Sequence, residues 1–211
     1  MEQTMKISSS PHIRDRESTT NIMGQVLLAL MPATLFGIYN FGIRALVIIL
    51  ITVISCVFFE AAFEKLTDRK NTIMDLSAAL TGLLLALNLP ADVPFWLPVI
   101  GSFFAIIVVK QVFGGLGQNF MNPALGARCF LLISFTGKMT TFTYDAVTTA
   151  TPLANLKAGE SVDVKAMFLG TTAGTIGETC ALALIAGGIY LLVRGIINYR
   201  IPLFYIGTFA I

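Results

Sequence analysis

Long apolar runs separated by short polar intervals dominate the pattern of residues along the chain. Two of them, residues 22–39 and 45–63, are close to the roughly 20 residues that an α-helix needs to cross a bilayer. The short turn between them contains Gly42 and Arg44. Pro32 lies inside the first run, where membrane helices tolerate a proline if neighbours satisfy the freed carbonyl. The pattern therefore predicts two membrane-spanning helices, the first of them kinked.

Shorter apolar runs follow, flanked by residues that begin helices or mark an interface. Asp75 is placed to cap a short helix over residues 76–89. Trp96 is typical of the membrane interface and stands near the start of a predicted span over residues 94–113. The remaining apolar runs cover residues 124–135, 178–193 and 201–211. Gly- and Thr-rich residues 170–177 predict a broken or re-entrant segment between two of these runs.

The composition supports this interpretation. Of the 211 residues, 55% are hydrophobic and 12% charged, against about 25% charged in soluble domains. The net charge of +2 is too small to indicate a nucleic-acid partner. Cys56, Cys129 and Cys180 lie far apart without a CxxC spacing, so we expect no metal or iron–sulfur site within the chain. The predicted fold class is an all-α polytopic membrane protein, a helical bundle in a lipid bilayer with broken helices.

One interruption of the apolar pattern is rich in glycine and amide side chains. It reads Phe113-Gly-Gly-Leu-Gly-Gln-Asn-Phe-Met-Asn-Pro-Ala124. Non-helical backbone at membrane depth must be buried in protein or line a cavity. The stretch is either an ordinary interhelical loop or a site for a planar polar ligand. The candidate residues for such a site are Gly117, Gln118, Asn119 and Asn122.

A second polar interval, residues 138–165, is rich in threonine. Pro152 biases Thr151 toward an extended backbone, which presents the threonine hydroxyl to other molecules. On the residues alone, this is either a threonine-rich turn or an exposed attachment point.

The same interval resembles a flavin-attachment motif, Asp-x-x-(Ser/Thr)-Gly-Ala-Thr. Asp145, Thr148, Ala150 and Thr151 match it, whereas Thr149 stands where glycine is usual. The pattern is similar to that of the D subunit of the Rnf complex and of its relative, the B subunit of the sodium-pumping NADH:quinone reductase. The resemblance implies FMN bound covalently to Thr151 through a phosphoester, attached by a separate flavin transferase.

Two further stretches carry the same resemblance. Residues 113–124 are similar to the family's glycine–asparagine motif, and residues 8–14 are similar to the start of the Rnf D subunit. The quinone-reductase relative holds riboflavin without a covalent bond, which suggests a second flavin near Asn119 and Asn122. The resemblance implies a subunit of an ion-translocating oxidoreductase that relays electrons between other Rnf subunits, coupled to Na⁺ or H⁺ export, with no catalytic residue of its own. The alternatives are the quinone-reductase B subunit and a flavin-free solute channel or transporter.

Two loosely similar stretches, residues 75–82 and 176–183, each place an acid at the start of a short helix. Membrane folds with broken helices are often inverted repeats. We therefore expect two related halves, with the second incomplete. The predicted organisation is a cytoplasmic tail over residues 1–21, a first membrane repeat over 22–137, an extracytoplasmic flavin-bearing loop over 138–169, and the start of a second repeat over 170–211.

Basic residues favour the cytoplasmic side of a membrane. They gather in the tail, in residues 64–75 and in the turn 194–200. The count of spans then places the glycine-rich loop inside and Thr151 outside, in a bacterial inner membrane. Glu60, Asp75 and Glu178 stand near predicted helix ends, either as caps or as members of an ion path.

Overall fold

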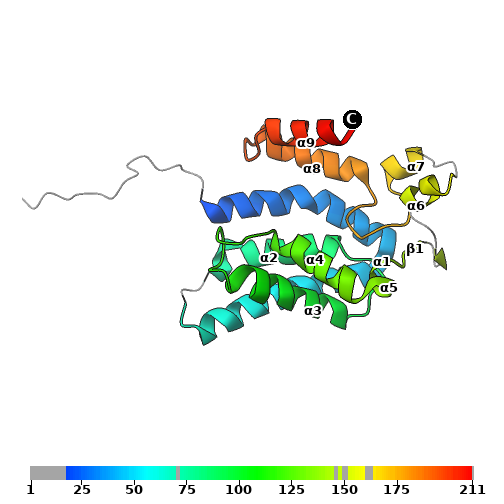
Figure 1. The fold of residues 1–211 in the computed structure, drawn as a ribbon. Coiled ribbons are helices and arrows are strands. Elements are labelled where there is room, and N and C mark those ends of the chain that lie inside the picture. The colour runs from blue at the N-terminus through cyan, green and yellow to red at the C-terminus, as the bar shows by residue number, and fades with distance from the viewer. Residues whose placement is uncertain (1–17, 70–71, 145–146, 149–151, 160–163, 211) are drawn as a thin grey trace, which may run out of the picture.

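The fold is a bundle of helices with one short β-hairpin. The computed structural model describes residues 18–69, 72–144, 147–148, 152–159 and 164–210 (Figure 1). The predicted all-α membrane fold is confirmed.

Helix α1, Thr19–Leu66, contains both of the long predicted spans. Its one non-helical residue is Gly42, with φ 72° and ψ −159°, a conformation that glycine adopts readily. The chain reverses there, so that the two halves of α1 run in opposite directions (Figure 1). Helical dihedral angles continue through Pro32, so the change of direction lies at Gly42 instead.

The next elements form most of the remaining bundle. A 3-10 turn, η1 (Ile73–Asp75), leads into α2 (Ser77–Leu87), and Asp75 Oδ1 accepts a hydrogen bond from the Ser77 amide at 2.8 Å. Asp75 thus bonds to the first residue of α2, but the N-cap position is Leu76 rather than the predicted Asp75. The predicted span over residues 94–113 is helical from Trp96 to Gln111, but it changes from α3 (Trp96–Phe103) to a π-helix, η2 (Phe104–Gln111). The sequence did not predict this change. Helix α4 is Pro123–Ser134, close to the prediction.

The polar interval contains short elements rather than a continuous loop. These are α5 (Thr136–Met139), β1 (Thr143–Tyr144), β2 (Val147–Thr148), α6 (Pro152–Lys157) and α7 (Val164–Leu169). The strands pair antiparallel, with Thr143 opposite Thr148.

Two helices complete the described chain, α8 (Ala181–Val193) and α9 (Arg200–Ala210). The predicted start of α8 at Glu178 is wrong by three residues. The Glu178 carboxylate does not cap the helix, because it pairs with Arg128 of α4 at 2.9 Å. Arg128 also donates to the side-chain oxygen of Asn88 at 2.6 Å, so it joins the end of α2 to the approach to α8.

The predicted broken segment before α8 is non-helical and pairs with the end of α2. The Ile176 amide donates to the Leu89 carbonyl at 3.0 Å, and the Gly177 amide donates to the Leu87 carbonyl at 2.8 Å. These carbonyls have no partner inside α2, because the helix ends there. A low-dielectric membrane has no water to satisfy these carbonyls, so the broken segment before α8 supplies the hydrogen-bond donors.

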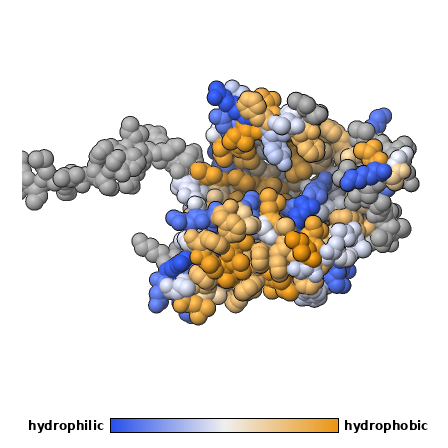
Figure 2. Space-filling model, in the orientation of Figure 1, coloured by the Kyte–Doolittle hydropathy of each residue, from blue (hydrophilic) through white to orange (hydrophobic). Residues whose placement is uncertain are grey.

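The interior is apolar, and so is much of the surface. Fully buried side chains include Ile48, Leu97, Leu131 and Ile176. Many large apolar side chains are exposed, and Figure 2 shows them covering much of the visible face, interrupted by hydrophilic residues toward both ends and in one strip near the middle. Helix α1 is apolar and long enough to cross a membrane. Such a surface suits lipid contact rather than water.

Side-chain contacts show which loops share an end of the bundle. Thr20 donates to the Met74 carbonyl, and Arg69 to the Gln111 carbonyl at 3.0 Å, so the start of α1, residues 67–69 and 72–76, and the glycine-rich loop share the first end. At the second end, Arg44 donates to the Ala91 carbonyl at 3.1 Å and Asn40 to the Gly170 carbonyl at 3.3 Å. From the start of α1 to Gly170, the loops joined by these bonds therefore lie alternately at the first and the second end.

A close backbone approach at Gly37 predicts a stability effect. A Cβ atom there would overlap the carbonyl oxygen of Ile176. We expect Gly37→Ala to destabilise the protein by about 1–3 kcal/mol, because backbone atoms must move. Thermal denaturation in detergent measures the effect. Gly188→Ala is the matched control, since a Cβ atom there meets nothing within 4 Å; equal loss of stability in both variants would contradict the prediction.

Candidate functional site

The predicted FMN-attachment motif lies mostly outside the described residues. Thr148 ends β2 and Pro152 begins α6, while Asp145, Thr149, Ala150 and Thr151 are not described. Figure 1 shows the elements around the motif toward the same side as the turn of α1, which is the second end of the bundle. The described residues just after it, from Leu156 to Gly159, are exposed.

The glycine-rich loop lies at the first end, between η2 and α4. Gly114, Gly115 and Gly117 have φ values of 119°, 95° and 84°, which favour glycine. The Gly115 amide donates to the Lys110 carbonyl at 3.0 Å, and the Gly114 amide donates to the Gln111 carbonyl at 3.1 Å. The loop is therefore tied directly to the end of the π-helix.

The two asparagines of this loop differ in their bonding. The Asn122 side chain accepts from the Ala124 and Leu125 amides at 3.0 and 3.4 Å and so caps α4. This is the structural role that its place before Pro123 allows. The Asn119 side-chain oxygen is buried and accepts no hydrogen bond from the described residues. Of the two asparagines, Asn119 is thus the one whose side-chain oxygen has no partner among the described residues.

The aromatic residues of the loop contact each other. The rings of Phe113 and Phe120 have centroids 4.6 Å apart and are tilted by 57°. Both side chains are exposed, so a flat ligand has access to their outer faces but not to the space between them. Gln118 is also exposed, and a Cβ atom at Gly117 would meet nothing within 4 Å. The predicted candidates therefore lie in one exposed loop, in which the Asn119 side-chain oxygen has no partner among the described residues.

A buried charge cluster, which the sequence analysis missed, lies directly beneath this loop. Lys110 Nζ is 2.5 Å from Glu60 Oε1 and 2.6 Å from Ser77 Oγ. Gln111 also donates to Glu60 Oε1, at 2.7 Å. Glu60 is 0% exposed and Lys110 1%. The second half of α1, the start of α2 and the end of η2 each supply a side chain to this cluster.

One acceptor of the cluster has no partner. Glu60 Oε2 is buried and accepts no hydrogen bond from the described residues. Glu64, one turn further along α1, accepts instead from the amide and hydroxyl of Thr72. The sequence marks Glu60 as an acid near a predicted helix end, but its pattern does not single out Lys110 as a partner. The available signal was a lone lysine inside an apolar run, since an ionisable residue within a membrane is a functional candidate.

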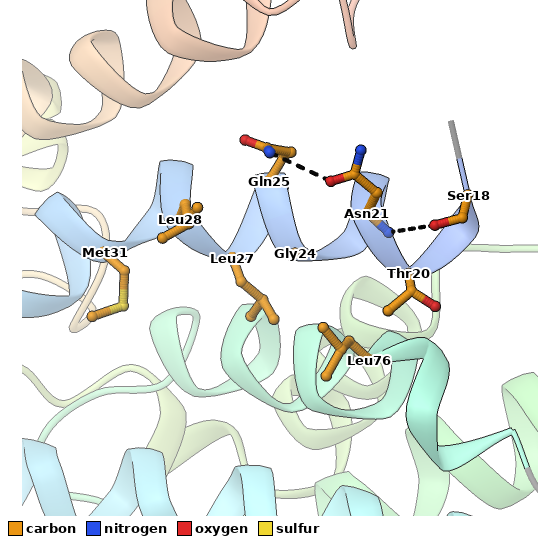
Figure 3. Close-up of a pocket in the computed structure, with 9 residues that line it drawn as sticks. All are labelled: Ser18, Thr20, Asn21, Gly24, Gln25, Leu27, Leu28, Met31 and Leu76. Atoms are coloured by element: carbon orange, nitrogen blue, oxygen red, sulfur yellow. Dashed lines mark hydrogen bonds between the residues drawn. The ribbon is translucent and has the colours of Figure 1, made fainter. Parts of the chain in front are cut away.

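Two cavities lie along the first half of α1, and none of their lining residues is a predicted flavin-site residue. The larger, about 660 Å³, has its polar lining at Ser18, Thr20, Asn21 and Gln25, while Leu27, Leu28, Met31 and Leu76 line most of the rest (Figure 3). The smaller, about 260 Å³, continues from Leu28 to Pro32 and Tyr190 of α8. The Tyr190 hydroxyl donates to the Gln25 side chain, which holds α8 against α1. Among the described residues, no three His, Cys, Asp or Glu side chains are grouped to hold a metal ion.

Known proteins are similar to this chain over its whole length. The model of the NQR2, RnfD, RnfE family matches residues 6–211. A protein of Acetobacterium woodii, named as the D subunit of a Na(+)-translocating ferredoxin:NAD(+) oxidoreductase complex, is 52% identical, over 100% of this chain and 69% of its own length. A protein of Clostridium ljungdahlii named for proton translocation in the same kind of complex is 47% identical, over 97% of this chain and 67% of its own length.

A third relative extends the comparison to a more distant protein. The Rhodobacter capsulatus protein, named as the D subunit of an ion-translocating oxidoreductase complex, is 37% identical, over 95% of this chain and 66% of its own length. The relatives are thus named as subunits of membrane oxidoreductase complexes that move ions. With a family model that matches nearly every residue, and with a predominantly helical membrane fold, the chain belongs to the NQR2, RnfD, RnfE family.

Proposed function

We propose that this chain is the membrane subunit that carries covalent FMN in an ion-translocating ferredoxin:NAD oxidoreductase (Rnf) complex. It relays electrons between partner subunits of that complex and has no catalytic activity alone. Bound FMN supplies the redox chemistry, and the chain supplies its attachment, orientation and surroundings. Thr151 is the attachment residue, and a separate flavin transferase forms the bond because a threonine hydroxyl is a weak nucleophile.

The observation that carries the proposal is the motif Asp145–Thr151 in a chain of this family. The described neighbours are compatible with attachment, because the motif joins two short elements at one end of the bundle and the residues after it are exposed. The glycine-rich loop lies at the opposite end. An electron-carrying group near Thr151 would thus serve partners on one face of the membrane.

The decisive experiment is purification of the complex through a tag on this chain. The denatured chain should fluoresce under ultraviolet light on a gel, and the native complex should pass electrons from reduced ferredoxin to NAD while ions enter sealed vesicles. Reduction of a quinone instead of NAD would favour the quinone-reductase alternative. A colourless protein that moves a solute without electron transfer would favour a channel or transporter.

The proposal places Thr151 outside and the N-terminus in the cytoplasm of a bacterial cell. A cysteine introduced at Ala158, in a chain without its three native cysteines, should react with a membrane-impermeant thiol reagent in intact cells. Ala158 is exposed and suits this test better than the adjacent Gly159, whose φ of 82° disfavours a side chain. Labelling that occurs only after lysis would reverse the orientation.

A second, non-covalent flavin such as riboflavin belongs to the same proposal, at Gly117, Gln118, Asn119 and Asn122. Acid precipitation should release it while FMN stays with the protein. We expect Asn119→Leu to reduce the released fraction, because it removes the unpaired oxygen. The covalent fraction should not change.

Asn122 needs a different substitution, because its side chain caps α4. Asn122→Asp keeps the side-chain oxygen that caps α4 and removes only the amide nitrogen, so it is the variant to compare with Asn119→Leu. Asn122→Ala would remove the cap as well, at a cost of about 0.5–2 kcal/mol of stability. Complex that releases no flavin even with both asparagines present would exclude this second site.

A further inference from the structure

The buried Glu60–Lys110 pair is costly to form. Taking two charges out of water carries a penalty that their mutual attraction repays only if the remaining polar atoms are also satisfied. Here they are not, since Glu60 Oε2 has no partner among the described residues although the side chain is 0% exposed. An apolar pair of the same volume would hold the helices together as well or better. The arrangement therefore calls for a functional explanation.

The geometry around Lys110 resembles that of a bound cation. Its ammonium lies between a carboxylate oxygen of Glu60 and the hydroxyl of Ser77, at 2.5 and 2.6 Å. Oxygen atoms of this kind are the ligands that hard cations prefer. A mobile cation at this place would compete with Lys110 for the same atoms, and the free Oε2 would give it another ligand.

The backbone that carries Lys110 is unusual. Residues 104–111 form a π-helix, shown by the Val112 amide bonding to the Ile107 carbonyl at 3.0 Å. π-helices are rare and occur frequently at functional sites. The chain after Lys110 enters the loop with three positive-φ glycines, and the Gly115 amide bonds back to the Lys110 carbonyl at 3.0 Å.

We propose that Glu60 is a cation-binding site in the ion path and that Lys110 is its tethered counter-ion, displaced when a mobile cation arrives. Lys110 keeps the Glu60 carboxylate neutralised between transport events, and Glu64 and Asp75 are the other charged groups that act on it. The mobile cation is Na⁺ or H⁺; both bind a carboxylate, and the experiment separates them. The inference rests on the proposed function, because it places a step of ion translocation in this chain.

The first test removes both charges together. The double variant Glu60→Gln with Lys110→Met preserves side-chain volume and leaves no unpaired buried charge. In the complete complex in sealed vesicles, with ferredoxin as electron donor, we expect it to assemble, keep its covalent flavin and pass electrons when an ionophore is present. Uptake of radioactive sodium, or of protons followed with a pH-sensitive dye, should be lost. Normal ion uptake per electron by the double variant would overturn the proposal.

The second test does not depend on transport. Lys110→Met leaves the Glu60 carboxylate without its counter-ion, so the cation that normally replaces Lys110 should stabilise the variant by binding. We expect its thermal unfolding midpoint to rise when sodium chloride replaces choline chloride at constant ionic strength, or when the pH is lowered. The response identifies Na⁺ or H⁺, respectively. The double variant, which has no carboxylate at position 60, should respond to neither.

A Lys110→Met complex that responds no more than the double variant would show that the pair is structural only. If Lys110→Met yields no complex, ion uptake by the double variant is the measurement that supports or overturns the proposal. Failure of the proposed function looks different: the wild-type complex would then pass electrons without taking up any ion.

Discussion

Thr151→Ala is expected to abolish the ultraviolet fluorescence of the denatured chain completely. The phosphoester needs the threonine hydroxyl as its attachment atom, and alanine offers no oxygen. The chain should still be inserted in the membrane and assembled with its partners, because the substitution removes only a hydroxyl and one methyl group from a polar interval. Electron transfer through the complex should fall together with the fluorescence.

Thr149→Ala is the matched control for this experiment. It removes a hydroxyl two residues away, at the position where the attachment motif usually has glycine. Fluorescence should persist in this variant. Undiminished fluorescence in Thr151→Ala, or its loss in Thr149→Ala alone, would move the attachment to another residue.

Lys110→Met, tested without sodium, is expected to destabilise the fold by about 3–5 kcal/mol, because it leaves the buried Glu60 carboxylate without its ion pair. The effect should show as a lower thermal unfolding midpoint in detergent and as less assembled complex in the membrane. Restoring neutrality with Glu60→Gln in the same chain should recover most of the loss. Such a recovery is the sign of direct coupling between the two side chains.

Lys138→Met provides the control of identical chemistry on the surface. Lys138 is exposed at the end of α5, where substitutions usually change stability by less than about 0.5 kcal/mol. A similar loss in Lys110→Met and Lys138→Met would show that removal of any lysine, rather than breaking of the buried pair, causes the effect.

Local rules in the sequence predicted the elements that depend on local interactions. The apolar runs gave both halves of α1 and helix α4, and the position of Asp75 before an apolar run predicted the bond to the Ser77 amide. Each of these features depends on residues close together in the chain, so a pattern of polarity or a capping residue is sufficient.

The features that the sequence did not predict depend on distant partners. Glu178 resembles a helix cap, but its carboxylate pairs with Arg128, which lies fifty residues earlier. The π-helix is not visible in the sequence, because residues 104–109 are all apolar and no period stands out. Lys110 stands out in the sequence as an isolated charge, but its partner Glu60 lies on another helix, so no local pattern predicts the pair.

The pairing of residues 176 and 177 with the end of α2 also bears on the order of events during synthesis. The Leu87 and Leu89 carbonyls find their donors only after the chain has been extended through α3, α4 and the polar interval. Until then, α2 has open backbone acceptors that lipid cannot satisfy. We therefore expect that α2 does not reach its final position as soon as it is made. It stays beside the insertion machinery or at the membrane surface until residues 176 and 177 have been synthesised and can donate to its carbonyls.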